Sequence, residues 1–116
     1  MATQENKTLK LTLKRKWFEM ILSGEKKEEY REIKSYWIRR LCFKDSMWED
    51  SHYNSIENNR IKTDFYKFIE FKNGYSKNAP SFKIECKGIF IGGAKPEWSD
   101  NWPGQVFIIK LGNVIK

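Results

Sequence analysis

The sequence has few of the residues that build metal centres and disulfide frameworks. Its 116 residues contain two cysteines, Cys42 and Cys86, without a Cys-x-x-Cys spacing, and a single histidine, His52. A structural zinc site usually takes four ligands, so these three residues do not make up a standard Cys/His site. We therefore expect no metal and no other cofactor. His52 lies in a polar stretch, where an exposed imidazole without a catalytic role is the expected state.

Long apolar stretches are missing as well. A membrane-spanning helix needs about 20 consecutive apolar residues, and the longest apolar runs here are far shorter. A secretory leader is not recognisable before residue 8. Together with the scarcity of cysteine, these absences predict a cytoplasmic protein with reduced thiols and no membrane partner.

Positive charge and aromatic rings, by contrast, are abundant. Lys and Arg number 22 against 15 Asp and Glu, and 16% of the residues are aromatic. A chain of this length forms one domain with one core, too small to absorb so many rings, so some are expected at the surface or in a cleft. A basic surface with rings favours RNA, another single-stranded nucleic acid or a nucleotide as the partner. The alternative is a charge excess that serves only solubility.

Apolar periodicity predicts the elements of the first third of the chain. Leucines at alternate positions predict a half-buried strand over residues 8–14. An i, i+3, i+4 pattern predicts an amphipathic helix over residues 15–23, which Gly24 ends in a left-handed cap. A strand over residues 27–33 follows, and Ser35 is expected to cap a second short helix.

The remainder predicts further strands around a polar insertion at residues 43–64. Gly88 is expected to mark a bulge at which a strand bends. Five or six strands with two or three short helices predict an α+β fold, a small mixed β-barrel in a single domain over residues 1–116. The expected later strands cover residues 65–71, closed by an Asn73-Gly74 turn, 81–91, 106–111 and, after Gly112-Asn113, 114–115.

A dense run of charges follows the first predicted helix and includes Lys26, Glu29 and Arg31. In an extended strand Glu29 and Arg31 lie on one face. In a regular strand Lys26 would lie on the opposite face. It joins Glu29 and Arg31 only if the turn after Gly24 bends the backbone before the strand begins. Such a trio suits a polar, partly anionic ligand, because arginine offers a planar fork to phosphate and glutamate accepts protons from a base edge. The alternative is a solvated strand with weakly paired charges.

The spacing Gly24-x-Lys26-x-x-Glu29-x-Arg31 resembles the Gly-x-Lys-x-x-Glu-x-Arg signature of the ASCH domain family, which belongs to the PUA-like superfamily of small β-barrels. The likeness covers residues 8–41 and 80–115, which resemble small phage and bacterial members. It includes a basic aromatic segment, Lys34-Ser35-Tyr36-Trp37, and a late loop, Lys95-Pro96-Glu97-Trp98. The resemblance implies recognition of RNA or a modified nucleotide, in a cleft that we expect Lys26, Glu29 and Arg31 to line.

Further side chains outside this signature are candidates for the same surface. Trp98 is expected either to stack on a base, for about 1–3 kcal/mol, or to plug the open end of the barrel. Glu85 is a weak candidate for a catalytic carboxylate, and its alternative is an exposed, salt-bridged glutamate. Tyr36 and Trp37, beside Arg39 and Arg40, can add rings and charge.

The resemblance also implies an enzymatic alternative. Certain small ASCH proteins are amidohydrolases that deacetylate N4-acetylcytidine with a signature lysine, a threonine and a distant glutamate. Lys26 matches the lysine, whereas Glu29 stands at the threonine position and Glu85 is a weak candidate for the distant glutamate. A ribonuclease with Lys26 and Glu29 as acid and base is a variant of this class. A protein-interaction adaptor that docks through the polar insertion is a third alternative.

Overall fold

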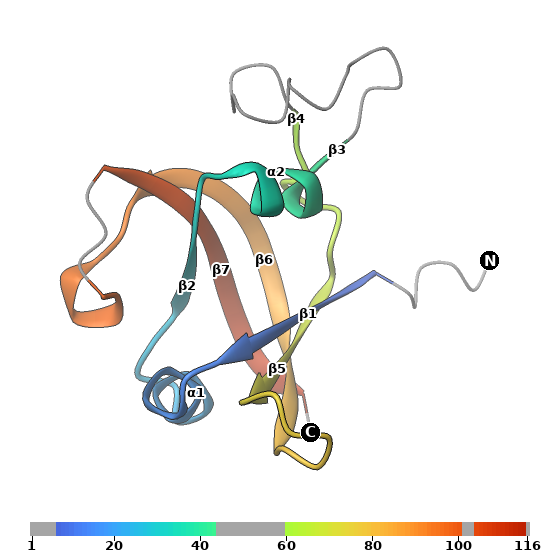
Figure 1. Ribbon diagram of the computed structural model, residues 1–116, viewed down its shortest axis with the longest axis vertical. Helices are drawn as coiled ribbons and strands as arrows, with labels where there is room; N and C mark the ends of the chain where they lie inside the picture. The colour runs from blue at the N-terminus through green and yellow to red at the C-terminus, as the bar shows by residue number, and fades with distance from the viewer. Residues whose placement is uncertain (1–6, 44–59, 101–103, 116) are drawn as a thin grey trace.

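The computed structural model describes residues 7–43, 60–100 and 104–115 (Figure 1). Five strands form one strongly curled mixed sheet in the order β1-β5-β6-β7-β2, and two short helices accompany it. The predicted α+β class with a barrel-like sheet is confirmed, as a half-barrel whose edge strands are β1 and β2. In chain order the elements are β1 (Thr8–Leu13), α1 (Arg15–Leu22), β2 (Glu28–Glu32), α2 (Ser35–Leu41), β3 (Cys42–Phe43), β4 (Arg60–Ile61), β5 (Phe68–Asn73), β6 (Ser81–Gly93), a 3₁₀ turn (Pro96–Trp98) and β7 (Gln105–Ile115).

Two long strands, β6 and β7, give the sheet its curl. They pair antiparallel along most of their length, as do β5 with β6 and β2 with β7, while β1 runs parallel to β5. The β6–β7 register shifts on both sides of Cys86, next to Gly88, whose φ is +132°. The predicted bulge is therefore confirmed, and only glycine adopts such a φ without strain.

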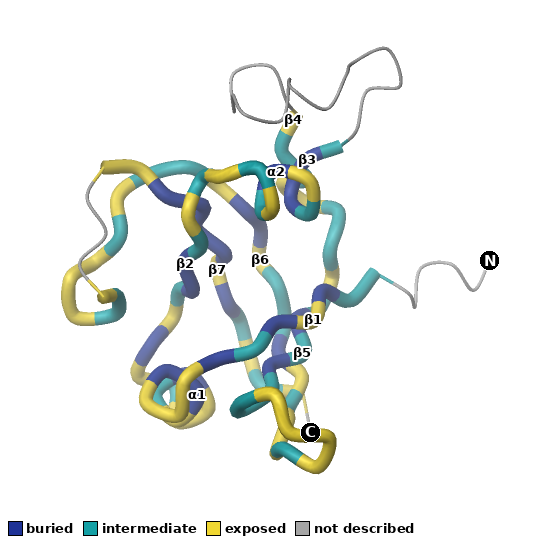
Figure 2. The backbone as a smooth tube through the Cα atoms, in the orientation of Figure 1, coloured by how far each residue is buried: buried dark blue, intermediate teal, exposed yellow. Residues whose placement is uncertain are grey.

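The core fills the concave side of the sheet. Leu9, Leu11 and Leu13 are all buried, as their alternation predicts, and α1 adds Trp17 and Ile21. Figure 2 shows the buried stretches of α1, β1, β5 and β7 in dark blue. Burial of each large apolar side chain stabilises the fold by about 1.5–3 kcal/mol.

Apart from shifts of one or two residues at other element ends, three predictions about element boundaries differ from the structure. The strand predicted from residue 65 begins at Phe68, because Phe65 belongs to a turn. Helix α2 starts at Ser35, so the cap position is Lys34, whose side chain makes no capping bond. The Gly112-Asn113 pair does not interrupt β7, which pairs with β6 as far as Ile115.

The predicted polar insertion lies mostly outside the described residues. Residues 44–59, which include His52, are not described, whereas their flanks form the short antiparallel ladder of β3 and β4. Phe43 pairs with Arg60 across this ladder. In the described part of the chain, neither helix is long and apolar enough to cross a bilayer.

Candidate functional site

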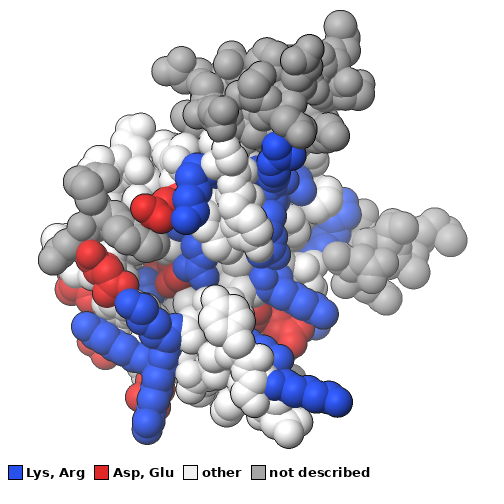
Figure 3. Space-filling view, viewed as in Figure 1, with Lys and Arg blue, Asp and Glu red and all other residues white. Residues whose placement is uncertain are grey.

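A cavity of about 810 Å³ lies where the half-barrel is open, between β1 and β2. Its described lining contains six aromatic, five basic and three acidic residues. These are Trp17, Tyr30, Tyr36, Trp37, Tyr75 and Trp98; Lys10, Lys14, Arg31, Lys34 and Arg40; and Glu29, Glu32 and Asp100. Lys and Arg side chains gather on the face of the molecule that carries α2 and β1 (Figure 3).

The turn after α1 brings Lys26 to the signature strand. Gly24, at φ +91°, donates its N–H to the carbonyl of Ile21 at 3.0 Å. The backbone N–H of Lys26 then bonds the carbonyl of Met20, also at 3.0 Å. Because β2 begins only at Glu28, Lys26 precedes the strand, and its side chain does not follow the alternation of side chains between the two faces. The expected left-handed cap and the bend that the grouping required are both present.

Lys26 is buried and its ammonium group is fully engaged. Nζ lies 3.2 Å from Oε1 of Glu29 and donates to the carbonyls of Glu28 and, at 2.8 Å, Trp98. These three oxygens match the three N–H donors of an ammonium group. Its side chain is 1% exposed, and Lys26 is not part of the described cavity lining. Burial lowers the pKa of Lys26, and the carboxylate of Glu29 opposes that shift.

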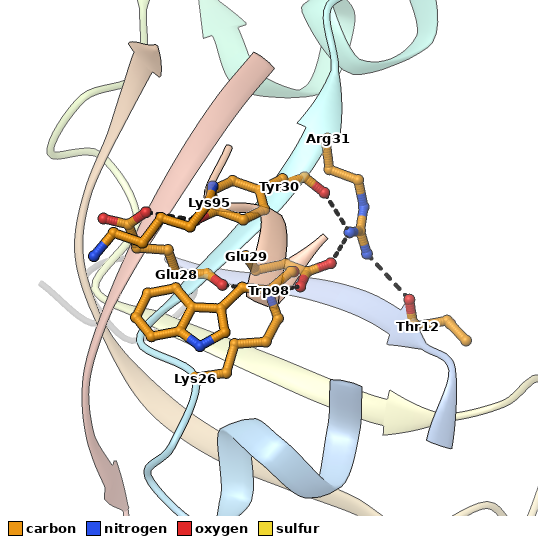
Figure 4. A network of polar contacts seen from close by, with 8 residues as sticks. All are labelled: Thr12, Lys26, Glu28, Glu29, Tyr30, Arg31, Lys95 and Trp98. Carbon is orange, nitrogen blue, oxygen red and sulfur yellow. Dashed lines mark hydrogen bonds and ion pairs between the residues drawn. The ribbon is translucent and has the colours of Figure 1, made fainter. Parts of the chain in front are cut away.

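Arg31 bridges the two edges of the sheet. Its Nη1 donates to Oε2 of Glu29 and, at 2.8 Å, to the carbonyl of Tyr30, while Nη2 donates to the carbonyl of Thr12 on β1 at 3.1 Å (Figure 4). The guanidinium also lies 5.0 Å from the ring centroid of Trp37. Glu29 thus joins Lys26 to Arg31, and the three side chains are in contact, as their predicted grouping requires.

A second arginine repeats this contact on β1. Nη2 of Arg40, from α2, donates to the carbonyl of Lys10 at 3.1 Å. Its guanidinium lies 5.3 Å from the ring centroid of Trp37 and 5.8 Å from that of Tyr36. Two arginine side chains, rather than backbone bonds between β1 and β2, therefore connect the opening of the half-barrel.

The outward carbonyls of β2 are occupied as well. The bond from Leu111 N–H to the Lys27 carbonyl sets the ladder pattern, in which alternate residues of β2 point away from β7. The outward carbonyls accept from the side chain of Lys26, the side chain of Arg31 and the backbone N–H of Lys34. An incoming peptide strand would have to displace these donors before it could pair with the edge.

Trp98 lies at the rim of the cavity and also packs against the outer face of the sheet. Tyr30 belongs to a small buried cluster there, and its hydroxyl donates to Oε1 of Glu28 at 2.7 Å and accepts the backbone N–H of Lys95 at 3.2 Å. Burial raises the pKa of Tyr30. The Lys95 ammonium lies 4.6 Å from the ring centroid of Trp98. The cluster consists of Tyr30, Val106 and Ile108, with Ala94 and Trp98 packed against it.

Glu85 does not join these residues. It lies at the bulge of β6, where Oε1 accepts the backbone N–H of Asn113 at 2.9 Å. Its carboxylate fills the space beside Gly112, and it is not part of the described cavity lining. The position gives Glu85 a structural contact in the β6–β7 ladder.

Several cavity residues were not among the sequence candidates, and Lys10, Trp17 and Tyr75 are examples. Lys10 and Trp17 lie on the first strand and helix, where periodicity identifies only which side chains face the core. Tyr75 follows the Asn73-Gly74 turn and is 90% exposed. It reaches the cavity because the N–H of Gly74 bonds the carbonyl of Leu13 at the end of β1. No local signal predicts that contact.

No family model, curated protein or solved structure matches this chain. Within the described residues, no group of three Cys, His, Asp or Glu side chains is placed to hold a metal ion.

Proposed function

We propose that this protein is an ASCH-like domain that binds RNA, another single-stranded nucleic acid or a nucleotide in the cavity between β1 and β2. The observation that carries the proposal is the cavity lining, where four rings that reach the surface lie among five basic and three acidic side chains; these rings are Tyr36, Trp37, Tyr75 and Trp98. Rings supply stacking surfaces for bases, and cations neutralise phosphates. The Gly24-to-Arg31 signature meets this cavity at Glu29 and Arg31, which supports the family assignment.

The described contacts give these side chains different roles in the proposed binding. Arg31 is held by three acceptors on β1 and β2, so its planar fork is oriented before a ligand arrives. Tyr36 is 56% exposed beside Arg40, which supplies a ring and a cation at the mouth of the cavity. Lys26 holds Glu29 and the Trp98 carbonyl in place and acts as a positioning residue.

The test is a titration of fluorescently labelled single-stranded RNA and DNA, read by anisotropy at several salt concentrations. Affinity is expected to fall with salt, with a log–log slope of about −0.7 for each phosphate contact. Arg40→Gln should weaken binding and make this slope shallower, whereas Lys87→Gln, on the exposed face of β6, should change neither. Absent or salt-insensitive binding to every RNA, DNA and nucleotide tested would overturn the proposal.

One observation favours the amidohydrolase alternative: burial lowers the pKa of Lys26, which increases the share of neutral, nucleophilic amine. Two observations oppose it, since Nζ of Lys26 is covered by three oxygens and Glu85 lies in the β6–β7 ladder. Incubation with N4-acetylcytidine decides between the two readings. Release of cytidine that is lost in Lys26→Ala would make the protein an enzyme.

A further inference from the structure

A second cluster of rings and cations lies beyond the cavity, where β3 and β4 meet the turn before β5. It consists of Phe43, Phe65 and Tyr66 with Lys7, Arg60 and Lys62, and is called the Phe65 cluster below. The ring of Phe65 meets those of Phe43 and Tyr66 edge to face, with centroids 5.4 and 5.0 Å apart. All three rings are half-buried, so the cluster is fixed on the protein and still reaches its surface.

In the described part of the chain, the cations of this cluster contact rings rather than carboxylates. Nζ of Lys7 lies 4.0 Å from the Phe65 centroid, and the Arg60 guanidinium lies 4.7 Å from that of Phe43. Lys62 Nζ lies 4.9 Å from the Phe65 centroid. Cation–π contacts orient a cation without neutralising its charge. Among the described residues, no acidic side chain forms an ion pair with these three cations, although the exposed Asp64 lies in the same turn.

The Phe65 cluster is continuous with the cavity through Arg40. The hydroxyl of Tyr66 donates to the backbone carbonyl of Arg40 at 3.1 Å, and the side chain of Arg40 lines the cavity. The N–H of Lys62 bonds the carbonyl of Leu41, the next residue along α2, at 2.8 Å. A chain that leaves the cavity past Arg40 therefore meets the Phe65 cluster next.

We infer that the ligand is a single-stranded polynucleotide, with a base in the cavity and the phosphodiester backbone continuing past Arg40 onto the Phe65 cluster. This inference rests on the proposed function and narrows its ligand from any nucleotide to a chain of several. Single-strand binders commonly combine a basic track with stacking rings, over about 4–16 nucleotides in one small barrel. A free mononucleotide does not extend beyond the cavity and leaves the second cluster empty.

The first experiment compares ligand lengths on the intact protein. Oligonucleotides of one sequence, as RNA and as DNA, are titrated at lengths of about 1, 4, 8 and 12 nucleotides. Affinity should rise with length, and the salt slope should steepen as more phosphates are contacted. Equal affinity for the mononucleotide and the longest chain would overturn this inference and leave the proposed function standing. Failure of every length to bind would overturn both.

The second experiment removes charge from the Phe65 cluster alone. Lys7→Gln with Arg60→Gln should make the salt slope for the 12-nucleotide chain shallower by about 1.4, which corresponds to two phosphates, and leave mononucleotide binding unchanged. Lys83→Gln with Lys87→Gln removes the same charge from β6 and should leave the slope unchanged. If the two double variants behave alike, the inference is wrong.

A ring variant tests the same cluster independently of charge. Phe65→Leu keeps an apolar side chain and should weaken binding of the 12-nucleotide chain by about fivefold or more through lost stacking. Circular dichroism checks that the variant is folded. An unchanged affinity in a folded variant would count against the Phe65 cluster, as would binding of this cluster to anionic lipid vesicles in place of oligonucleotides.

Discussion

At the residue scale, the feature that most needs an explanation is a pair of buried charges. In the described part of the chain, Lys26 and Glu29 are the two charged residues that are fully buried. An isolated buried charge is costly, and it is tolerated where partners and hydrogen bonds replace water. Glu29 has a cation on each oxygen, and the ammonium of Lys26 has three oxygen partners. Each charge therefore depends on the others.

Removal of two members together is expected to cost less than the sum of the two single removals. Lys26→Met should lower the free energy of unfolding by about 3 kcal/mol, because it leaves Glu29 with one cation and two carbonyls without donors. The Lys26→Met, Glu29→Gln double variant should lose less than the sum of the single losses. Urea unfolding of Lys26→Met, Glu29→Gln and the double variant measures the three losses. Arg15→Ala, which breaks an exposed pair with Glu19, is the control and should cost about 0.5 kcal/mol. If the loss in the double variant equals the sum of the two single losses, the charges are not coupled.

The buried thiol of Cys42 is expected to make the folded protein less stable at alkaline pH. Burial raises the pKa of its thiol from 9.0 to about 11, so the folded chain retains a proton that the unfolded chain releases. The contribution of the neutral thiol to the free energy of unfolding is complete below pH 9. It is lost as the pH rises to 11, a change of about 3 kcal/mol. In reducing buffer, the stability difference between the native protein and Cys42→Ala should narrow across this range. A constant difference would show that the thiol does not titrate as expected.

At the scale of elements, the turn between α1 and β2 decides where the signature residues point. Lys26 reaches Glu29 only because the chain turns at Gly24 and binds back to the end of α1. A regular strand from residue 26 would place the two side chains on opposite faces. The glycine of the signature is therefore a requirement of the backbone, and the lysine depends on it.

Substitution of Gly24 should cost stability through the backbone alone. The left-handed φ of +91° disfavours any residue with a Cβ by about 1–2 kcal/mol, while the nearest atom to an added Cβ is the mobile Nζ of Lys27 at 3.9 Å. Gly24→Ala should lose about that amount in thermal or urea unfolding. Gly93→Ala is the matched control, because Gly93 has open space and no positive φ, and it should stay within about 0.5 kcal/mol of the native protein. Equal losses would rule out the backbone explanation.

At the scale of the whole molecule, the open side of the half-barrel combines stability with access. The edge carbonyls of β1 and β2 accept bonds from Arg31, Arg40 and Lys26, so the exposed edges are not left as templates for aggregation. The same arrangement keeps a cavity open between the strands and surrounds it with positive charge. A net charge of +7 extends this field and favours encounter with anionic chains.

Residues 44–59 are expected to be dispensable for folding. Their ends are held together by the Phe43–Arg60 pair, so a two-residue Asn-Gly turn fits in their place. Loop closure favours the shorter chain by about 0.6 kcal/mol for each halving of length. The shortened protein should unfold at the same or a higher temperature and keep its affinity for oligonucleotides. Failure to fold would contradict this expectation, and a protein partner bound only by the full chain would support the adaptor alternative.

Much of the fold was predictable from the sequence because it depends on neighbours along the chain. Alternating leucines indicate β1, helical periodicity and Gly24 indicate α1 and its end, and Gly88 indicates the bulge. The contact of Lys26, Glu29 and Arg31 was predictable too, on the condition that the turn bends before the strand. The start of β5 was misplaced, since the rings of Phe65 and Tyr66 fit a strand pattern but belong to the Phe65 cluster.

By itself, then, the sequence determined the α+β class, the order of the strands along the chain and the acidic and basic residues of the signature. Only the tertiary structure decided that Arg31 and Arg40 meet the carbonyls of β1, that Tyr75 reaches the cavity and that Glu85 lies apart from it. The physical reason is the curl of the sheet, which is the sum of pairings between strands distant in sequence. That curl sets how far apart the two edges stand, and no local pattern records the distance.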